Sequence, residues 1–455
     1  MGMKPVTLET IARVTCGTLV GGGENITITG VVRDNREVKE GNLFVCFAGE
    51  KVDGHSFASK AYEAGAAACL AQRELEDAKG PYILVEDTFQ AIKDLAKYYR
   101  SLLNIPVIGV TGSVGKTTAK EMTAAALSAK LNVLKTTANL NNELGVPLTL
   151  LSITEEHEAA VVEMGISDFG EMSRLADMVR PDICIMTTIG FCHLETLGDL
   201  DGVLRAKSEV FEYMNENGVA IVNGDDEKLA AFDPGVRKIT FGYGEQNDWR
   251  GENIRADGTE GVLCDIVNSD GTFSAYIPAF GNHMVLGALP AAIAARLLGL
   301  TNEEIERGLL KYAPVGGRAN IKDTEYIRII DDCYNANPNS MAASLGSLSS
   351  VEGRKVAILG DMKELGAASR DLHRSIGVLA GQYGIDSVIC LGAEAEFIYK
   401  GFISGGFETE AWHFPMKEAM FSVLPRLIKK GDTVLVKASH SMGFDEVVAE
   451  LEKLK

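Results

Sequence analysis

The segment from Val107 to Lys120, VIGVTGSVGKTTAK, constrains the fold most, because a glycine turn joins an apolar run to an alanine-rich amphipathic run. The apolar run from 104 to 110 predicts a buried strand, and TTAKEMTAAALSAKL predicts a helix. A strand, a glycine turn and a helix N-terminus together form a cradle for a phosphate group. The segment therefore predicts an α/β domain with a nucleotide site.

The turn departs from the strict phosphate-loop pattern, which has its first glycine where this chain has Val110. Gly112 and Gly115 can take backbone angles that other residues avoid. Lys116 can reach the β- and γ-phosphates, and Thr117 can offer its hydroxyl to Mg²⁺. An ordinary glycine-rich turn is the alternative, but the Gly-Lys-Thr-Thr ending favours an ATP site of a variant type.

The alternation of apolar runs divides the chain into three predicted domains, since 455 residues exceed the usual size of one core. Residues 1–103 predict a small α/β module that ends in a helix. Residues 104–315 alternate strands with helices, which predicts a mostly parallel sheet covered on both faces. Residues 316–455 repeat this pattern and predict a second, doubly wound domain of the Rossmann-like type.

Composition narrows the class of partners and the location. The net charge of −19 argues against a nucleic-acid partner, which would require a basic face. No apolar run approaches the ~20 residues that span a bilayer, and the N-terminus lacks the apolar part of a secretion signal. The eight cysteines form no C-x-x-C pair and are interpreted as reduced. We expect a cytoplasmic protein without a transmembrane segment, and a monomer.

Polar residues that end apolar runs are candidates for a site, because ligands of open α/β sheets bind beyond the carboxyl ends of the strands. In the last domain these residues are Asp332, Asn335, Asp361 and Lys437. Each alone is more often a turn or cap residue. Their shared location favours a common site.

The middle domain supplies further candidates. Glu163 ends the run AAVVE and could bind Mg²⁺, which prefers oxygen ligands, although an exposed strand-end charge is the alternative. His193 alone is interpreted as a packed or capping residue, because imidazole is a softer ligand than Mg²⁺ usually takes. Lys207 alone is interpreted as a solvated helix lysine. The asparagines of TTANLNNELGVPLTLL suit a ligand-lining turn, but turn formation explains them nearly as well.

Several ordered motifs resemble the Mur ligase family over nearly the whole chain. They are GVTGSVGKTTAKE, NLNNELGVPLTLL, EMGISDFGEM, GFCHLETLG, AKSEVF, YNANPNSM and GDMKELG. The resemblance implies an enzyme that uses ATP and Mg²⁺ to join a carboxylate to an amine through an acyl phosphate. The last two motifs favour UDP-N-acetylmuramoyl-tripeptide and D-alanyl-D-alanine as substrates, in peptidoglycan synthesis. A related ligase with another amino acid or dipeptide acceptor, and a non-catalytic ATP-binding scaffold, are the alternatives.

The same resemblance implies roles for individual residues. Lys116, Glu163, His193 and Lys207 would be catalytic. Thr117 and Glu163 would hold one Mg²⁺, and His193 would hold a second together with Lys207, carbamylated by CO₂. The ATP-binding residues would be Gly112, Ser113, Gly115, Lys116, Thr117, Thr118, Asn142, Arg318 and Asp332. The substrate would contact Asp34, Asn35, Arg36, Asn335 and Asn337, and the segment RDNREVKEGNLFVCFAGEKVDGHSF would hold the uridine diphosphate group.

Four departures from the family pattern leave the phosphate loop and the metal residues intact but weaken the assignment of the substrate. Asn35 stands where serine is usual, and GRANI lacks the acidic residue that often follows its arginine. In the His-Asn signature near the adenine, Met284 replaces the asparagine, and Gly287 stands at a later asparagine position. His440 replaces an arginine, and histidine is only partly charged near pH 7.

Overall fold

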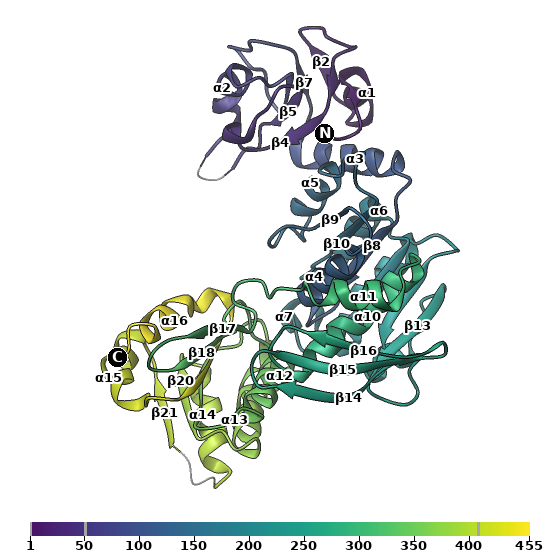
Figure 1. The fold of residues 1–455 in the computed structure, drawn as a ribbon. Helices are drawn as coiled ribbons and strands as arrows, with labels where there is room; N and C mark the ends of the chain where they lie inside the picture. The colour runs from purple at the N-terminus through teal and green to yellow at the C-terminus, as the bar shows by residue number, and fades with distance from the viewer. Residues whose placement is uncertain (1, 50–51, 407–409) are drawn as a thin grey trace.

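Three large sheets follow one another along the chain in the computed structural model, which describes residues 2–49, 52–406 and 410–455 (Figure 1). Five strands form the first sheet, nine the second and six the third. The predicted α/β fold of three domains is confirmed. Within the described ranges, no helix has the length and apolar character needed to cross a membrane. The eight cysteines, all of which the structure describes, are free thiols.

The first sheet has the strand order β2-β7-β6-β5-β4, antiparallel between β2 and β7 and parallel elsewhere. Every position of β5 and β6 is buried, and both strands are apolar in the sequence apart from Asn42 at the start of β5. The elements of this part are β1 (Val6–Thr7), α1 (Leu8–Val14), β2 (Thr18–Val20), β3 (Thr27–Ile28), β4 (Gly30–Val32), η1 (Asn35–Glu37), β5 (Asn42–Val45), η2 (Gly54–Phe57), α2 (Ala58–Glu63), β6 (Ala68–Ala71), β7 (Tyr82–Leu84) and α3 (Thr88–Ser101).

Helix α3 connects the first sheet to the second. It packs against α5 (Gly145–Leu151) and α6 (Glu171–Val179) of the middle part (Figure 1). The Tyr99 hydroxyl accepts the Lys4 N–H at 2.8 Å and donates to the Ile153 carbonyl at 2.6 Å. One buried apolar core therefore continues from the N-terminal strands into the middle sheet.

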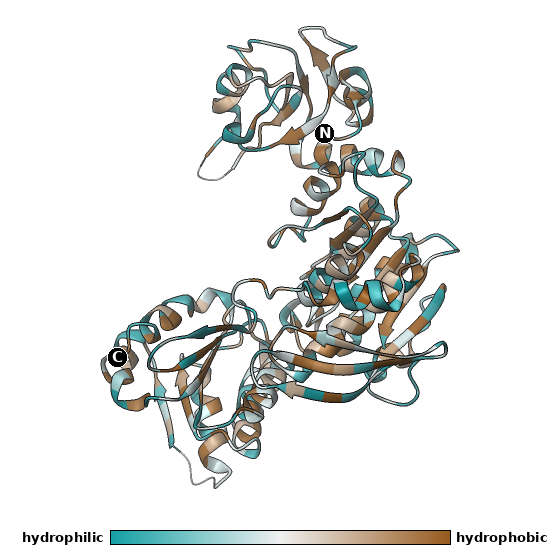
Figure 2. Ribbon diagram, in the orientation of Figure 1, coloured by the Kyte–Doolittle hydropathy of each residue, from teal (hydrophilic) through white to brown (hydrophobic). Residues whose placement is uncertain are grey.

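The middle sheet has the order β16-β15-β14-β13-β12-β11-β8-β10-β9, parallel from β9 to β14 and antiparallel at the β14-β15-β16 edge. Successive residues of β8 enter different cores, Val107 on one face and Ile108 on the other. Its other elements are β8 (Val107–Thr111), α4 (Lys116–Leu127), β9 (Val133–Lys135), β10 (Ala159–Glu163), β11 (Ile183–Met186), α7 (Leu194–Leu197), α8 (Leu200–Ser208), η3 (Glu209–Tyr213), β12 (Val219–Asn223), α9 (Glu227–Ala231), β13 (Arg237–Gly242), β14 (Trp249–Asp257), β15 (Gly261–Asn268), β16 (Gly271–Ile277), η4 (Asn282–Met284), α10 (Val285–Leu297) and α11 (Asn302–Leu309). The central strands are strongly hydrophobic (Figure 2).

The third sheet has the order β17-β18-β22-β19-β20-β21, parallel except between β17 and β18. Helices α12 to α14 contribute to the core on one face, and α15 and α16 to the core on the other, so the domain is doubly wound. Its elements are β17 (Asn320–Asp323), β18 (Arg328–Asp331), α12 (Pro338–Ser349), β19 (Lys355–Gly360), η5 (Gly366–Ala368), α13 (Ser369–Gln382), β20 (Ser387–Leu391), α14 (Ala395–Ser404), β21 (Glu410–Phe414), α15 (Lys417–Leu427), β22 (Thr433–Lys437), η6 (His440–Met442) and α16 (Asp445–Leu451).

Candidate active site

A cavity of about 810 Å³ lies where the middle and C-terminal parts meet. Its walls contain residues from the glycine turn before α4, the end of β10, the loop before α7, and the loop between β18 and α12. The sequence-predicted residues that line it are Ser113, Gly115, Lys116, Thr117, Thr118, Asn142, Glu163, His193, Arg318, Asp332, Asn335, Asn337 and Lys437. The structure thus gathers most of the predicted site around one space.

The glycine turn has the geometry of a phosphate loop. Gly112 has φ +138°, and a Cβ there would lie 2.0 Å from Thr187 Oγ1, so only glycine fits. Gly115, with φ +83°, is the N-cap of α4. Ser113 anchors the turn, since its N–H donates to the Thr188 carbonyl at 2.8 Å. The first amide groups of α4 have no helical acceptor and face a position suited to an anion.

Lys116 folds back over this loop. Its Nζ donates to the Gly112 carbonyl at 2.6 Å, so the ammonium lies beside the turn that would receive the phosphates. Burial lowers the pKa of Lys116, while the nearby Cys192 and Glu163 act in the opposite direction. The Lys116 ammonium therefore lies beside the glycine turn, where its acceptors among the described residues are backbone carbonyls.

Thr117 and Glu163 form an oxygen-rich pair at the bottom of the cavity. The Thr117 hydroxyl donates to Glu163 Oε2 at 3.0 Å, and Asn141 Nδ2 donates to Oε1 at 2.8 Å. Lys120 Nζ lies 3.7 Å from Oε2. Glu163 is only 2% exposed, so the interpretation as an exposed strand-end charge is wrong. A hydroxyl and a carboxylate side by side are ligands of the kind that Mg²⁺ takes.

His193 contacts the C-terminal part of the chain. Its Nδ1 lies 2.6 Å from Glu364 Oε2, and the next residue, Leu194, donates its N–H to the Glu364 carbonyl at 3.0 Å. Burial lowers the pKa of His193, Glu364 raises it, and the Lys207 ammonium lowers it. The Glu364 carboxylate is therefore the polar partner of the His193 imidazole on the C-terminal side.

Lys207 is fully buried, so the interpretation as a solvated lysine is wrong. Its Nζ has no hydrogen-bond partner among the described residues. Burial, with a smaller contribution from Lys116, lowers its pKa to about 8. Among the residues that the structure describes, no three His, Cys, Asp or Glu side chains gather into a metal site. A metal beside His193 would need an oxygen ligand that an unmodified Lys207 does not supply.

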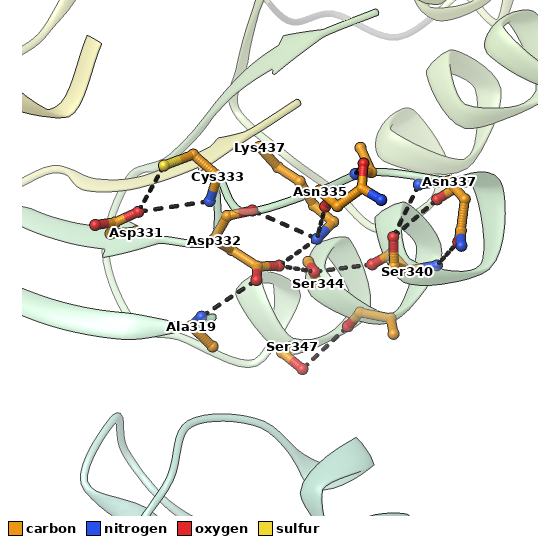
Figure 3. A network of polar contacts seen from close by, with 12 residues as sticks. Ala319, Asp331, Asp332, Cys333, Asn335, Asn337, Ser340, Ser344, Ser347 and Lys437 are labelled. Carbon is orange, nitrogen blue, oxygen red and sulfur yellow. Dashed lines mark hydrogen bonds and ion pairs between the residues drawn. The ribbon is translucent and has the colours of Figure 1, made fainter. Parts of the chain in front are cut away.

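The C-terminal wall of the cavity is a connected polar network (Figure 3). Lys437 Nζ lies 2.6 Å from Asp332 Oδ2 and donates to the Asn335 carbonyl at 3.2 Å. Ser344 donates to the same Asp332 oxygen at 2.6 Å. Asn337 caps α12, since its side chain accepts the N–H three residues later at 2.9 Å. The predicted residues at the ends of β18 and β22 thus hold one another in place.

Arg318 lies against an aromatic ring rather than a carboxylate. The centre of its guanidinium is 3.9 Å from the Tyr334 ring centroid, and the His440 ring is 5.5 Å from the same ring. The histidine that departs from the family pattern therefore packs beside Tyr334. Gly287 also has a packing role, since a Cβ there would lie 2.9 Å from Thr118 Cγ2.

Other predicted residues lie outside the cavity. Asp34, Asn35 and Arg36 form the turn at η1, where Asp34 accepts the Arg36 N–H and Nε–H, both at 2.9 Å. These bonds lower the pKa of Asp34 to about 2, and the Arg36 side chain is 84% exposed. Residues 50–51 of the predicted uridine segment lie outside the described residues. Asp361 accepts the Ala395 N–H at 2.8 Å and does not line the cavity.

Sequence reasoning missed four residues of the site. Asn141 was one of a cluster of asparagines, but nothing distinguished it as the partner of Glu163. Nothing in the sequence distinguishes Lys120 from a surface lysine of a helix. In the structure it is buried and donates to the Thr136 carbonyl at 2.8 Å. Tyr334 and Glu364 lie within quoted motifs, and only the tertiary structure gives them partners.

Comparisons with known proteins agree along the whole chain. Three family descriptions match in order: Mur ligase family, catalytic domain (residues 27–100), Mur ligase middle domain (residues 110–295), and Mur ligase, glutamate ligase domain (residues 317–440). The UDP-N-acetylmuramoyl-tripeptide–D-alanyl-D-alanine ligase of Bacillus subtilis (strain 168) is 37% identical over 451 residues, 98% of each chain. The ligase of the same name from Escherichia coli (strain K12) is 38% identical over 458 residues, 99% of each chain.

Solved structures give the same picture. A crystal structure of MurF from Acinetobacter baumannii matches with a TM-score of 0.90 and 30% identity over 100% of both chains. MurF ligase from Thermotoga maritima in complex with ADP matches with a TM-score of 0.81 and 30% identity, over 93% of this chain and 97% of that one.

Proposed function

The chain belongs to the Mur ligase family, and on that premise we propose how its residues carry the reaction. It is an ATP-dependent ligase of peptidoglycan synthesis that joins D-alanyl-D-alanine to UDP-N-acetylmuramoyl-tripeptide. The observation that carries the assignment is the single cavity that contains the phosphate loop, the Thr117–Glu163 pair and the polar wall around Asp332.

ATP binds with its phosphates on the glycine turn. Gly112, Ser113 and Gly115 shape the turn, and the amide groups at the start of α4 receive the phosphate oxygens. Lys116, already beside the turn, compensates the charge of the transferred phosphoryl group, where electrostatics and positioning supply most of the catalysis. Thr118 and Asn142 line the same wall, and Arg318 and Asp332 close the site from the C-terminal side.

Two magnesium sites fit the residues present. Thr117 and Glu163 supply a hydroxyl and a carboxylate for one ion. His193 and a carbamate on Lys207 supply the second. The buried and unpartnered Nζ of Lys207 supports this modification, because reaction of the amine with CO₂ releases a proton and leaves an anionic oxygen ligand. The magnesium ions, when bound, would neutralise the charge that develops on the phosphate oxygens.

The reaction passes through an acyl phosphate. The terminal carboxylate of the tripeptide attacks the γ-phosphorus, ADP leaves, and the amine of D-alanyl-D-alanine then displaces inorganic phosphate. Asn335 and Asn337, which line the C-terminal wall, contact the peptide part of the substrates. Enclosure of the cavity between two domains protects the acyl phosphate from water.

The remaining assignments concern the arrangement of the chain. Domain boundaries near residues 103 and 315 are supported by the ranges of the three sheets. We assign the uridine diphosphate group to the N-terminal domain near Asp34, Asn35 and Arg36, where the Arg36 guanidinium is exposed to solvent. The enzyme acts as a monomer in the cytoplasm, where ATP and the nucleotide-linked precursor are both present.

The test is phosphate release with Mg·ATP and UDP-N-acetylmuramoyl-tripeptide, with and without D-alanyl-D-alanine, with the products weighed by mass spectrometry. A UDP-pentapeptide that forms only with the dipeptide is the expected product. Lys116→Ala should abolish product formation, whereas Lys453→Ala, an exposed lysine paired with Glu450, should not. Product with a different amine, and none with the dipeptide, would assign another acceptor. An unchanged Lys116→Ala rate would exclude the proposed role of the loop.

A further inference from the structure

His193 and Glu364 contact each other across the boundary between the middle and C-terminal domains, and both have unusual backbones. Their φ angles are +51° and +65°, in the left-handed region that non-glycine residues seldom adopt. Such conformations persist only where the surrounding structure holds them, and they concentrate at functional sites. Two such residues in direct contact indicate that the surrounding structure holds this junction in one conformation.

Two interactions fix the junction. The carboxylate of Glu364 lies 2.6 Å from His193 Nδ1, and the Glu364 carbonyl accepts the Leu194 N–H at 3.0 Å. Glu364 lies two residues before η5 of the C-terminal domain, and His193 directly before α7 of the middle domain. Glu364 of the motif GDMKELG thus contacts two parts of the motif GFCHLETLG, the His193 imidazole and the Leu194 N–H.

The pair is too exposed to act mainly as a stabilising ion pair. The Glu364 side chain is 57% exposed and that of His193 27%, and exposed pairs add little to stability. Its geometric effect is more specific. A carboxylate at Nδ1 selects the tautomer that donates from Nδ1 and leaves the Nε2 lone pair free. Carboxylates often orient the histidine ligands of metals in this way.

The geometry points to Glu364 as a positioning residue that orients His193 for the second magnesium ion. The inference rests on the proposed second metal site. Because Glu364 belongs to the C-terminal domain, the histidine is prepared for the metal only when that domain is docked. Docking of the acceptor domain and completion of the metal site are then a single event.

A docking role alone is the competing explanation, and the chain allows the two to be separated. In Glu364→Ala the backbone bond to Leu194 can persist, and so can the bond from the Phe191 N–H to Asn339 Oδ1 at 3.2 Å. The substitution therefore removes the carboxylate from His193 while two other contacts between the domains remain.

The experiment is a Mn²⁺ titration followed by electron paramagnetic resonance, with full-length protein and a non-hydrolysable ATP analogue, with small-angle scattering on the same samples. We expect Glu364→Ala to weaken one of two Mn²⁺ sites by about 10–100-fold without a change in scattering. Glu364→Gln, which keeps an oxygen acceptor, should give a smaller shift. The matched control is Glu396→Gln, which removes an exposed carboxylate paired with Lys400 within α14 of the same domain.

His193→Ala distinguishes the failure of this inference from failure of the metal site. If His193→Ala weakens one Mn²⁺ site and Glu364→Ala does not, the metal site stands and the role of Glu364 is overturned. If neither variant changes Mn²⁺ binding, the second metal site itself is wrong. A Glu364→Ala protein that expands in solution as it loses Mn²⁺ would show docking rather than positioning.

Discussion

The Thr117 hydroxyl donates to the Glu163 carboxylate at 3.0 Å, which joins the first turn of α4 to the end of β10. The two elements meet because β8 and β10 are parallel neighbours, so the loop after one strand lies beside the last residue of the other. Asn141 donates to the second carboxylate oxygen at 2.8 Å and fixes its direction. Two side chains therefore fix the direction of the Glu163 carboxylate where it lines the cavity.

Glu163→Gln should lower ligase turnover by about 10²–10³-fold, because the amide keeps the size of the side chain but removes the anionic oxygen offered to Mg²⁺. The measurement is ADP release over a range of MgCl₂ concentrations. Thr117→Ser is the matched control, since it retains the hydroxyl and should keep most of the activity. An unchanged magnesium dependence in Glu163→Gln would contradict the proposed ligand role.

Asp332→Asn should destabilise the C-terminal domain by about 3–5 kcal/mol, because it leaves the Lys437 ammonium buried without a counter-charge. The two side chains are only 15% and 4% exposed. Urea unfolding measures the loss. In the double variant Asp332→Asn, Lys437→Met, most of the stability should return while ligase activity stays low. If Asp332→Asn unfolds at the wild-type urea concentration, the pair has no structural role.

The stability of the C-terminal domain should fall as the pH decreases below about 6.5. The buried His373 accepts the Met362 N–H at Nε2 (2.9 Å) and donates from Nδ1 to the Ser369 carbonyl (2.7 Å), so it is neutral when folded. Burial lowers the pKa of His373 in the folded state, so the unfolded chain binds the proton more readily. The stabilising contribution is complete above the unfolded pKa and is lost as the pH falls through the folded one.

Thermal unfolding at pH 7.5 and 5.5 measures this effect. His373→Gln should lower stability at pH 7.5 and show a smaller difference between the two pH values than the wild type. Equal pH dependence in the two proteins would assign the effect to other groups.

Gly287→Ala should destabilise the middle domain by about 1–3 kcal/mol, because the added methyl group would overpack the contact between α10 and α4. The new Cβ would lie 2.9 Å from Thr118 Cγ2 and 3.0 Å from Met122 Sδ. The control is Gly346→Ala in α12, where the nearest atoms, on Tyr383, are at 3.7 Å. That variant should be neutral or gain up to about 1 kcal/mol from helix propensity. Denaturant unfolding measures the free energy of unfolding of both variants. Equal stability of the two variants would contradict the prediction.

Much of the fold was predictable because each buried strand corresponds to a short apolar run in the sequence. The buried parallel strands appear as unbroken apolar runs, and polar residues that end them, such as Glu163 and Asp332, lie at the cavity. The burial of Lys207 was not predictable, because its helix carries charged neighbours and the covering residues come from elsewhere. Asn141 and Glu364 owe their roles to partners distant in the sequence, which no local pattern identifies.

The apolar core that passes through α3 makes the N-terminal and middle sheets a single cooperative unit of unfolding. It contains buried residues of both sheets, between Met3 and Leu229, so unfolding of one sheet would expose apolar surface of the other. The C-terminal sheet has two cores of its own, to which the described residues of the earlier parts contribute buried Phe280 and partly buried Phe191. Thermal unfolding of the protein should therefore show two separate transitions. Two units of unfolding would then contain the three large sheets of this enzyme.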